Sequence, residues 1–221
     1  MQTYNLPQNP KCLIFDIDST LYTNSEYAHE QIDSQIRYFA DLRGITHKEA
    51  SDMVQDFRRE WAAEHDGQRI SLGNLFTNFG ITIDESIEWR KRLFDPAAYL
   101  TRDEELITVL TELKKKFYLI CVTNNPVEPA RKTLEVIGID KIIPDIIGLD
   151  TCRVSKPAVL PLKKALEKAR ENTGLLLGFE DCISIGDRYD IDLALPLQLG
   201  AGGILVDRVS DLYNLDKLLQ I

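Results

Sequence analysis

Long apolar runs are missing from this 221-residue sequence. Residues 1–11 are polar and punctuated by proline, and the apolar run that follows them is too short for a signal peptide or a membrane span. We therefore expect a cytoplasmic protein that has no membrane as a partner.

Cysteine and histidine are also scarce. The three histidines lack metal-ligand spacing, and the four cysteines form no CxxC pair and have no histidine nearby. These absences argue against a zinc site and against a disulfide framework. We expect the cysteines to be reduced, and two of them lie in short apolar runs that predict burial, namely Cys121 and Cys182.

Positive charge is in deficit, because 26 Lys and Arg residues face 35 Asp and Glu residues, for a formal net charge of -9. A chain of this sign repels the phosphate backbone, so a nucleic acid polymer is not an expected partner. A small anionic substrate would need a local cation or a bound metal. The hydrophobic content of 44% and the shortage of low-complexity sequence predict a folded globular protein.

Short apolar runs alternate with segments whose apolar residues recur three and four positions apart. This alternation predicts an α/β fold, with a Rossmann-like parallel sheet flanked by helices. The expected strands cover residues 12–15, 118–122, 142–149, 183–185 and 203–206. The expected helices cover residues 104–116, 128–137, 160–172, 190–199 and 209–219.

The gap between the first two strands is too long for one crossover helix. Its pattern is helical throughout, with breaks expected at Gly44, Gly67, Gly73 and Gly80. We predict a small α-helical cap domain at 25–96, inserted into a core domain formed by 1–24 and 97–221. A cap grafted after the first strand would cover the carboxyl edge of the sheet, where open parallel sheets bind ligands.

Two acids, Asp16 and Asp18, follow the first strand directly. Carboxylates so close to one another are costly unless a cation neutralises them. Asp16 could attack phosphorus to form an aspartyl-phosphate, while Asp18 protonates the leaving oxygen. An Asp-rich turn that caps a helix is the structural alternative.

Hydroxyl, amide and ammonium groups follow later in the chain. Thr123 and Asn124 end the second strand, where they could donate hydrogen bonds to a phosphoryl oxygen without adding negative charge. Lys156 precedes a helix and could balance both a nucleophile and a phosphate. Taken singly, Thr123 and Asn124 favour a turn or helix cap before Pro126, and Lys156 favours a solvated surface position. The order of the segments in the chain favours the functional interpretation.

A third strand ends in a glycine turn followed by acids. Magnesium prefers a few carboxylates together with phosphate and water oxygens, and Asp187 with Asp16 would supply that set. Asp192 could bind the metal or orient its other ligands. Magnesium is therefore the expected cofactor.

These four motifs, in this order, resemble the haloacid dehalogenase superfamily, in its phosphatase branch with a helical cap after the first motif. The resemblance implies that Asp16 is the nucleophile and a metal ligand, and that Asp18 is the general acid/base and binds the metal through its backbone carbonyl. It also implies a metal ligand at Asp187 and a supporting role for Asp192. Thr123 and Lys156 would hold the phosphate. True haloacid dehalogenases lack the second acid and need no magnesium.

The resemblance leaves the substrate open among small phosphorylated metabolites. Leu21 and Tyr22 resemble the pyrimidine 5'-nucleotidase-like subgroup, which favours a nucleoside monophosphate. However, Gln68 and Arg69 depart from the small hydroxyl residues usual in the cap loop of that subgroup. Gly186 and the four residues after it resemble the phosphoglycolate phosphatase-like branch instead. The candidates for substrate contacts in the cap are Arg58, Arg69 and Asn74, although each of them taken singly favours a solvated helix or loop residue.

Other functions are consistent with parts of the pattern. A sugar-phosphate phosphatase or a phosphomutase would use the same core, and a protein that keeps the fold could merely bind a partner. A receiver-type phospho-aspartate switch would use similar residues, but receivers have neither the acid at position 18 nor a cap. The sequence does not predict an oligomeric state.

Overall fold

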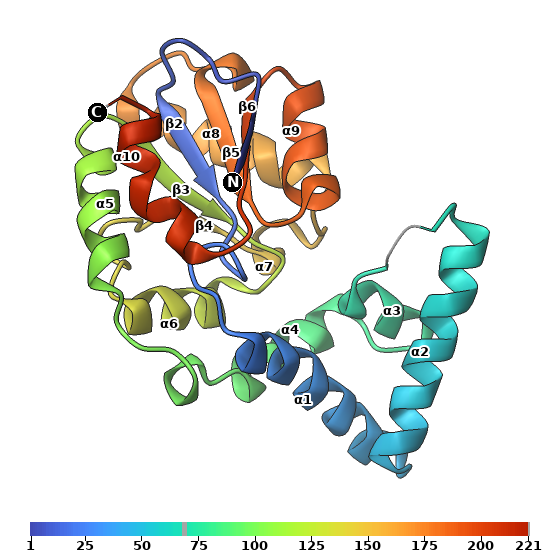
Figure 1. The fold of residues 1–221 in the computed structure, drawn as a ribbon. Helices are drawn as coiled ribbons and strands as arrows, with labels where there is room; N and C mark the ends of the chain where they lie inside the picture. The colour runs from blue at the N-terminus through green and yellow to red at the C-terminus, as the bar shows by residue number, and fades with distance from the viewer. Residues whose placement is uncertain (68–69, 221) are drawn as a thin grey trace. The chain divides into compact units, whose positions relative to one another are not determined.

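The computed structural model describes residues 1–67 and 70–220. The chain forms two compact units (Figure 1). One, here called the α/β unit, comprises Met1–Asn24 and Asp95–Ile221, and the other, here called the helical unit, comprises Ser25–Phe94. The cap interpretations that concern Gln68 and Arg69 lie outside the described residues.

A six-stranded sheet with the order β1-β6-β5-β2-β3-β4 runs through the α/β unit (Figure 1). The strands are β1 (Gln2–Tyr4), β2 (Cys12–Phe15), β3 (Tyr118–Val122), β4 (Ile146–Ile147), β5 (Cys182–Gly186) and β6 (Gly202–Leu205). β2 to β6 are parallel to one another, whereas β1 pairs antiparallel with β6. The predicted α/β class and Rossmann-like sheet are confirmed. The sequence analysis missed β1, which is a short polar edge strand.

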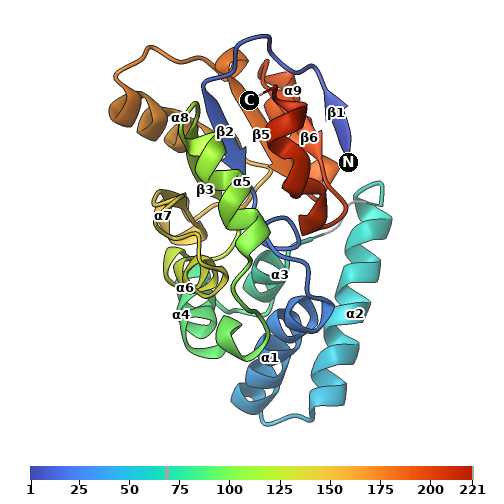
Figure 2. The ribbon, with the colours of Figure 1, turned by 60° about the vertical axis from the view of Figure 1, so that its left-hand side comes forward.

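Helices cover both faces of this sheet, with α5 and α10 on one face and α8 on the other (Figures 1 and 2). The α-helices of the unit are α5 (Glu104–Lys114), α6 (Val127–Ile137), α7 (Leu149–Cys152), α8 (Val159–Thr173), α9 (Ala194–Gln198) and α10 (Leu215–Leu218). Short 3-10 helices are η1 (Pro96–Ala98), η2 (Phe179–Asp181) and η4 (Val209–Asn214).

β2 lies at the centre of the sheet, where Phe15 is paired with Cys121 of β3 and Ile185 of β5. Ile14 belongs to the same apolar cluster as Ala165 of α8. Because successive strand residues point to opposite faces, its neighbours in β2 face the other layer of helices. All four residues of β2 are buried. The first polar side chain after β2 therefore emerges at the carboxyl edge of the sheet.

The strand predicted over residues 142–149 is much shorter in the structure. Ile142 and Ile143 donate backbone hydrogen bonds to the Ile139 carbonyl, so they form a turn after α6. Pro144 has no N–H group to donate to a strand ladder. Pairing is therefore confined to Ile146–Ile147.

The helix predicted over residues 190–199 begins differently. Its first part is a π-helix, η3 (Tyr189–Leu193), which continues as α9. A π-helix holds an extra residue in its turn. The last predicted helix, over residues 209–219, is likewise divided into the 3-10 helix η4 and the short α10.

The described part of the helical unit contains α1 (Ser25–Arg43), α2 (His47–Glu64), α3 (Leu72–Asn78) and α4 (Ile83–Leu93). The side chains of Thr46, Ser71 and Thr82 accept hydrogen bonds from backbone N–H groups in the first turns of α2, α3 and α4. The apolar faces of the helices share a core of aliphatic and aromatic side chains that includes Leu75, Phe39 and Phe76. Capping hydrogen bonds and apolar packing therefore both stabilise these helices.

The break predicted at Gly73 is wrong, because this residue lies inside α3. Gly73 is buried, and a Cβ atom there would lie 2.8 Å from Nη2 of Arg90. This glycine therefore allows α4 to pack closely against α3. Among the described residues, no helix is long and apolar enough to cross a membrane.

Substitutions at two glycines with positive φ would distinguish the cost of backbone strain from the cost of a steric clash. Gly138 ends α6 at a φ of 87°, and a Cβ atom there would lie 2.5 Å from Arg102 Nη1 and 2.8 Å from Ile107 Cδ1. Gly174 ends α8 at a φ of 69°, and no atom of the residues that the structure describes lies within 4 Å of such a Cβ. We predict that Gly174→Ala lowers the free energy of unfolding by about 1 kcal/mol and Gly138→Ala by at least about 2 kcal/mol. Urea denaturation of both variants measures the difference, and equal losses would contradict this account.

Candidate active site

Asp16 lies at the carboxyl end of β2, where its N–H donates to the Ile185 carbonyl at 2.9 Å. After it, Thr20 and Leu21 both donate backbone hydrogen bonds to Ile17, and Ser19 adopts a left-handed φ of 61°. This tight turn brings Thr20 close to Asp16, the residue that precedes the turn. Thr20 Oγ1 consequently lies 3.4 Å from Asp16 Oδ2.

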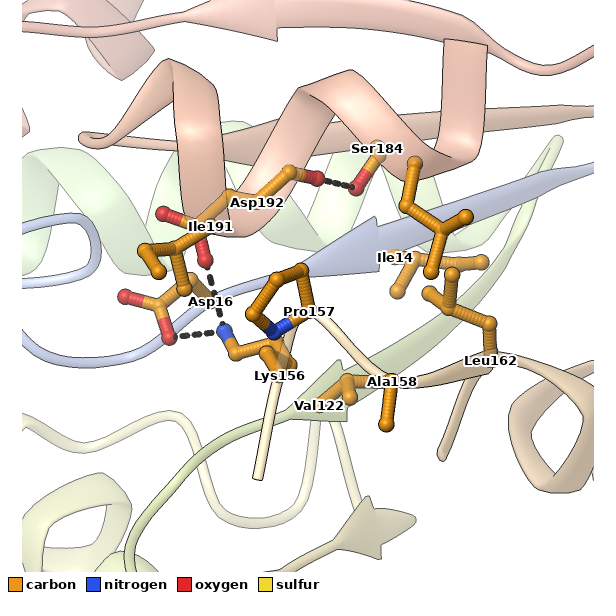
Figure 3. A pocket seen from close by; sticks show the side chains of 11 residues that line it. Ile14, Asp16, Val122, Lys156, Pro157, Ala158, Leu162, Ser184, Ile191 and Asp192 are labelled. Carbon is orange, nitrogen blue, oxygen red and sulfur yellow. Dashed lines mark hydrogen bonds and ion pairs between the residues drawn. The ribbon is translucent and has the colours of Figure 1, made fainter. Parts of the chain in front are cut away.

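The Lys156 ammonium lies between two buried carboxylates (Figure 3). Its Nζ is 2.5 Å from Asp16 Oδ1 and 2.8 Å from Asp192 Oδ1. Lys156 is 7% exposed, Asp16 9% and Asp192 3%. Beside them lies a cavity of about 10 Å³ whose lining includes Ile14 and Leu162. The ion pairs are therefore largely shielded from water.

Backbone geometry around η3 holds Asp192 in this position. Its Oδ2 accepts a hydrogen bond from the Arg188 N–H at 3.0 Å. Its backbone carbonyl accepts a second bond from Ser184 Oγ in β5 at 2.7 Å. The π-helix thus turns the Asp192 side chain toward β2.

Three carboxylates gather at this edge of the sheet. Asp16, Asp187 and Asp192 each offer an oxygen, and these oxygens lie within 4.8 Å of one another. Carboxylate oxygens are ligands that a hard divalent cation prefers, so the set fits such an ion. Within the described part of the chain, the Asp18 side chain is not a member of this cluster.

Burial and crowding of charge change the protonation of the cluster. Burial raises the pKa of Asp16 to about 7, repulsion from Asp192 and Asp18 adds to this rise, and the Lys156 ammonium opposes it. Burial, followed by repulsion from Asp192, raises the pKa of Asp187 to about 6. Burial would lower the pKa of Lys156, but the two carboxylates beside it raise that pKa overall. The cluster therefore has an excess of negative charge that a cation or protons would relieve.

Asp18 occupies a different environment from Asp16. Tyr22 Oη donates to its Oδ1 at 2.6 Å, and Asn125 Nδ2 donates to its Oδ2 at 2.9 Å. Thr123 Oγ1 lies 3.4 Å from the same Oδ2. The two acids of the first motif are thus close in sequence but held by different partners.

Asn124 lies beside this group with its amide directed at the backbone of Lys156. Its Oδ1 accepts from the Lys156 N–H at 2.6 Å, and its Nδ2 lies 3.4 Å from the Lys156 carbonyl. This side chain thereby positions the loop that carries the ammonium. The phosphate contacts predicted for Thr123, Asn124 and Lys156 remain predictions.

The sequence analysis missed two side chains that contact Asp18. Asn125 directly follows the predicted pair Thr123 and Asn124, and this adjacency was the available signal. Tyr22 lies four residues after Asp18, but this spacing implies contact only if the intervening turn is known. The cap residues Arg58 and Asn74 lie in α2 and α3.

The fold and the acidic edge of the sheet define an α/β protein of Rossmann-like architecture with an inserted helical segment. A model of the family described as haloacid dehalogenase-like hydrolases matches residues 10–200, and the chain belongs to this family. The superfamily predicted from the four motifs is therefore confirmed.

Solved structures with the same fold include proteins with different named activities. A haloacid dehalogenase-type phosphatase from Thermococcus onnurineus is 21% identical, with a TM-score of 0.63 over 95% of this chain and 97% of that chain. The putative hydrolase YfnB of Bacillus subtilis, solved bound to magnesium, is 16% identical, with a TM-score of 0.60 over 96% and 100%. A 2-haloacid dehalogenase from Pseudomonas syringae is also 16% identical, with a TM-score of 0.57 over 96% and 98%. At these identities the similarity shows the fold alone.

Removing the buried cation should destabilise the protein. In Lys156→Met, the carboxylates of Asp16 and Asp192 lose their shared partner, so we predict a loss of about 3–5 kcal/mol in the free energy of unfolding at neutral pH. The loss should be smaller near pH 5, where Asp16 is protonated. Urea denaturation without divalent cations measures both values. The exposed Lys163→Met is the control, and a similar loss in that variant would contradict the prediction.

Cation binding should compete with protons at the cluster. The raised pKa values of about 7 for Asp16 and about 6 for Asp187 mean that the folded protein retains protons that an unfolded chain has released. These carboxyls therefore favour the folded state at acid pH, and that contribution is lost as the pH rises through 6 to 7. A cation takes the place of the protons, so its stabilising effect should increase over the same range.

We predict that the Mg²⁺ concentration for half-maximal thermal stabilisation falls at least about tenfold between about pH 5 and about pH 8. Thermal unfolding across a magnesium titration measures it. Asp187→Asn should weaken the effect, whereas Asp190→Asn, which changes an exposed acid of η3, should leave it intact. An affinity that is independent of pH would contradict this account of proton competition at Asp16 and Asp187.

Proposed function

We propose that this chain is a magnesium-dependent phosphomonoester hydrolase that acts on a small phosphorylated metabolite through an aspartyl-phosphate on Asp16. The observation that carries this proposal is the separation of Asp16 from Asp18. Asp16 lies in the acidic cluster against Lys156, while Asp18 is held outside the cluster by Tyr22 and Asn125. A nucleophile and an acid/base need such different environments.

The donor set supports magnesium as the cofactor. Asp16, Asp187 and Asp192 offer carboxylate oxygens close enough to share one ion, and the raised pKa values of Asp16 and Asp187 indicate negative charge in need of compensation. Asp16 and Asp187 would hold the ion together with the Asp18 carbonyl, and Asp192 would support them. When bound, Mg²⁺ would neutralise the repulsion between these carboxylates and a phosphate.

In the first chemical step, an Asp16 carboxylate oxygen forms a bond to phosphorus as the bond from phosphorus to the ester oxygen breaks. Asp18 gives its proton to the departing oxygen, which leaves as an alcohol. In the second step, Asp18 takes a proton from water as the water oxygen bonds to phosphorus and the bond to Asp16 breaks. Lys156 balances the charge of the nucleophile and of the transferred group throughout.

The carboxylate at position 18 favours this chemistry over dehalogenation, which needs no proton donor for a halide leaving group. Within the phosphatase chemistry, we propose a nucleoside monophosphate as the first substrate to test, on the resemblance of Leu21 and Tyr22 to the nucleotidase subgroup. Phosphoglycolate and sugar phosphates are the alternatives, and transfer to a sugar hydroxyl would make the protein a phosphomutase.

The test is phosphate release from nucleoside monophosphates, phosphoglycolate, sugar phosphates and a chromogenic phosphate ester, each with Mg²⁺ and with excess chelator. We expect turnover that requires Mg²⁺ and that falls at least about 10³-fold in Asp16→Asn, which removes the nucleophile at nearly constant volume. Asp207→Asn, an exposed change in the same unit, is the control. Full activity of Asp16→Asn, or full activity in chelator, would refute the mechanism.

A further inference from the structure

Tyr22 is the residue that carries a further inference, which rests on the proposed function. Its hydroxyl lies 2.6 Å from Asp18 Oδ1, and the residue is 4% exposed. A hydroxyl that donates to a carboxyl oxygen at this distance forms a short hydrogen bond. Its burial restricts the positions that the hydroxyl can take.

The local backbone explains how Tyr22 reaches Asp18. The turn that follows β2 closes through hydrogen bonds from Thr20 and Leu21 to the Ile17 carbonyl. Two side-chain hydrogen bonds follow from this turn, and each joins residues that are four positions apart. Thr20 donates to Asp16, and Tyr22 donates to Asp18. Each acid of the motif is therefore contacted by a hydroxyl from the same turn.

Tyr22 donates to one oxygen of the Asp18 carboxyl group and Asn125 donates to the other. Two such contacts restrict rotation about the side-chain torsions of Asp18. Among the described residues, the Asp18 side chain held in this way is not a member of the cluster formed by Asp16, Asp187 and Asp192. Without Tyr22, Oδ1 loses a donor and the carboxylate can rotate away from the leaving-group oxygen.

The geometry points to Tyr22 as a positioning residue that aims the Asp18 carboxyl at the leaving group of the phosphate ester. Tyr22 itself acts through Asp18 and takes no part in bond making. Its contribution should therefore depend on how much the leaving group needs a proton. An alkoxide needs protonation as it departs, whereas nitrophenolate leaves readily without it.

The test compares Tyr22→Phe with the wild-type enzyme, with Mg²⁺ present, on an alkyl phosphate and on p-nitrophenyl phosphate. kcat/KM is the parameter to measure because it reports the step in which the leaving group departs. We expect a loss of about 10-fold to 100-fold on the alkyl ester and of less than about threefold on the nitrophenyl ester. A merely structural role would lower both values by the same factor.

Tyr213→Phe is a matched control. Tyr213 donates to Asp103 at 2.8 Å and lines the same cavity of about 450 Å³ as Tyr22, and in the described part of the chain its hydroxyl bonds to Asp103 and not to Asp18. This variant should keep the wild-type ratio of the two kcat/KM values. In an Asp18→Asn background, Tyr22→Phe should produce no further selective loss, because the group that it positions is already absent.

Equal losses on the two esters, or no loss on either, would overturn the assignment of Tyr22 while leaving the proposed hydrolase intact. A selective loss that persists in the Asp18→Asn background would also overturn it. If the wild-type protein releases phosphate from neither ester nor from the wider panel, the proposed function fails, and the role of Tyr22 fails with it.

Discussion

The ammonium group of Lys156 lies between the carboxylates of Asp16 and Asp192, and the arrangement of the carboxyl edge of the sheet depends on this contact. It joins the end of β2 to the π-helix after β5, and Asn124 ties the lysine backbone to the end of β3. A buried cation is costly to desolvate, and its carboxylate partners offset that cost. Removal of one partner would therefore destabilise the arrangement. Three strand ends are thereby connected through the side chain and the backbone of one residue.

The divergent environments of Asp16 and Asp18 follow from where β2 stops. Residues two apart in a strand point to the same face, which would place two like charges side by side. The turn after Ile17 removes Asp18 from the strand, and Tyr22 and Asn125 then hold it separately. Two identical side chains thus acquire different electrostatic surroundings within three residues of chain.

The strand ends were predictable because Asp16, Thr123 and Asp187 each follow an apolar run that is too short for a helix. Lys156 was predictable from its order among the motifs. The contact between Tyr22 and Asp18 was not, because it depends on the left-handed backbone of Ser19. The orientation of Asn124 depends on a loop from another part of the chain.

The secondary structure likewise contains elements that were predictable from the sequence and elements that were not. The fully buried β2 and the amphipathic α5 and α8 have clear apolar patterns, so the sequence was sufficient to predict them. The π-helix over Tyr189–Leu193 has the apolar spacing of an ordinary helix, and its wider turn accompanies the contacts of Asp192 with Arg188 and Ser184. Such tertiary contacts leave no periodic signal in the sequence.

The antiparallel strand β1 has a consequence for how the chain can be handled. It pairs along β6 through Gln2, Thr3 and Tyr4, and the amino terminus lies 3.4 Å from the carboxylates of Asp207 and Asp211. β1 therefore covers an edge of β6 whose unpaired N–H and C=O groups could otherwise recruit a strand from another molecule. An extension fused to Met1 that pulls β1 away would expose that edge and promote aggregation, whereas a fusion at the carboxyl terminus leaves it covered.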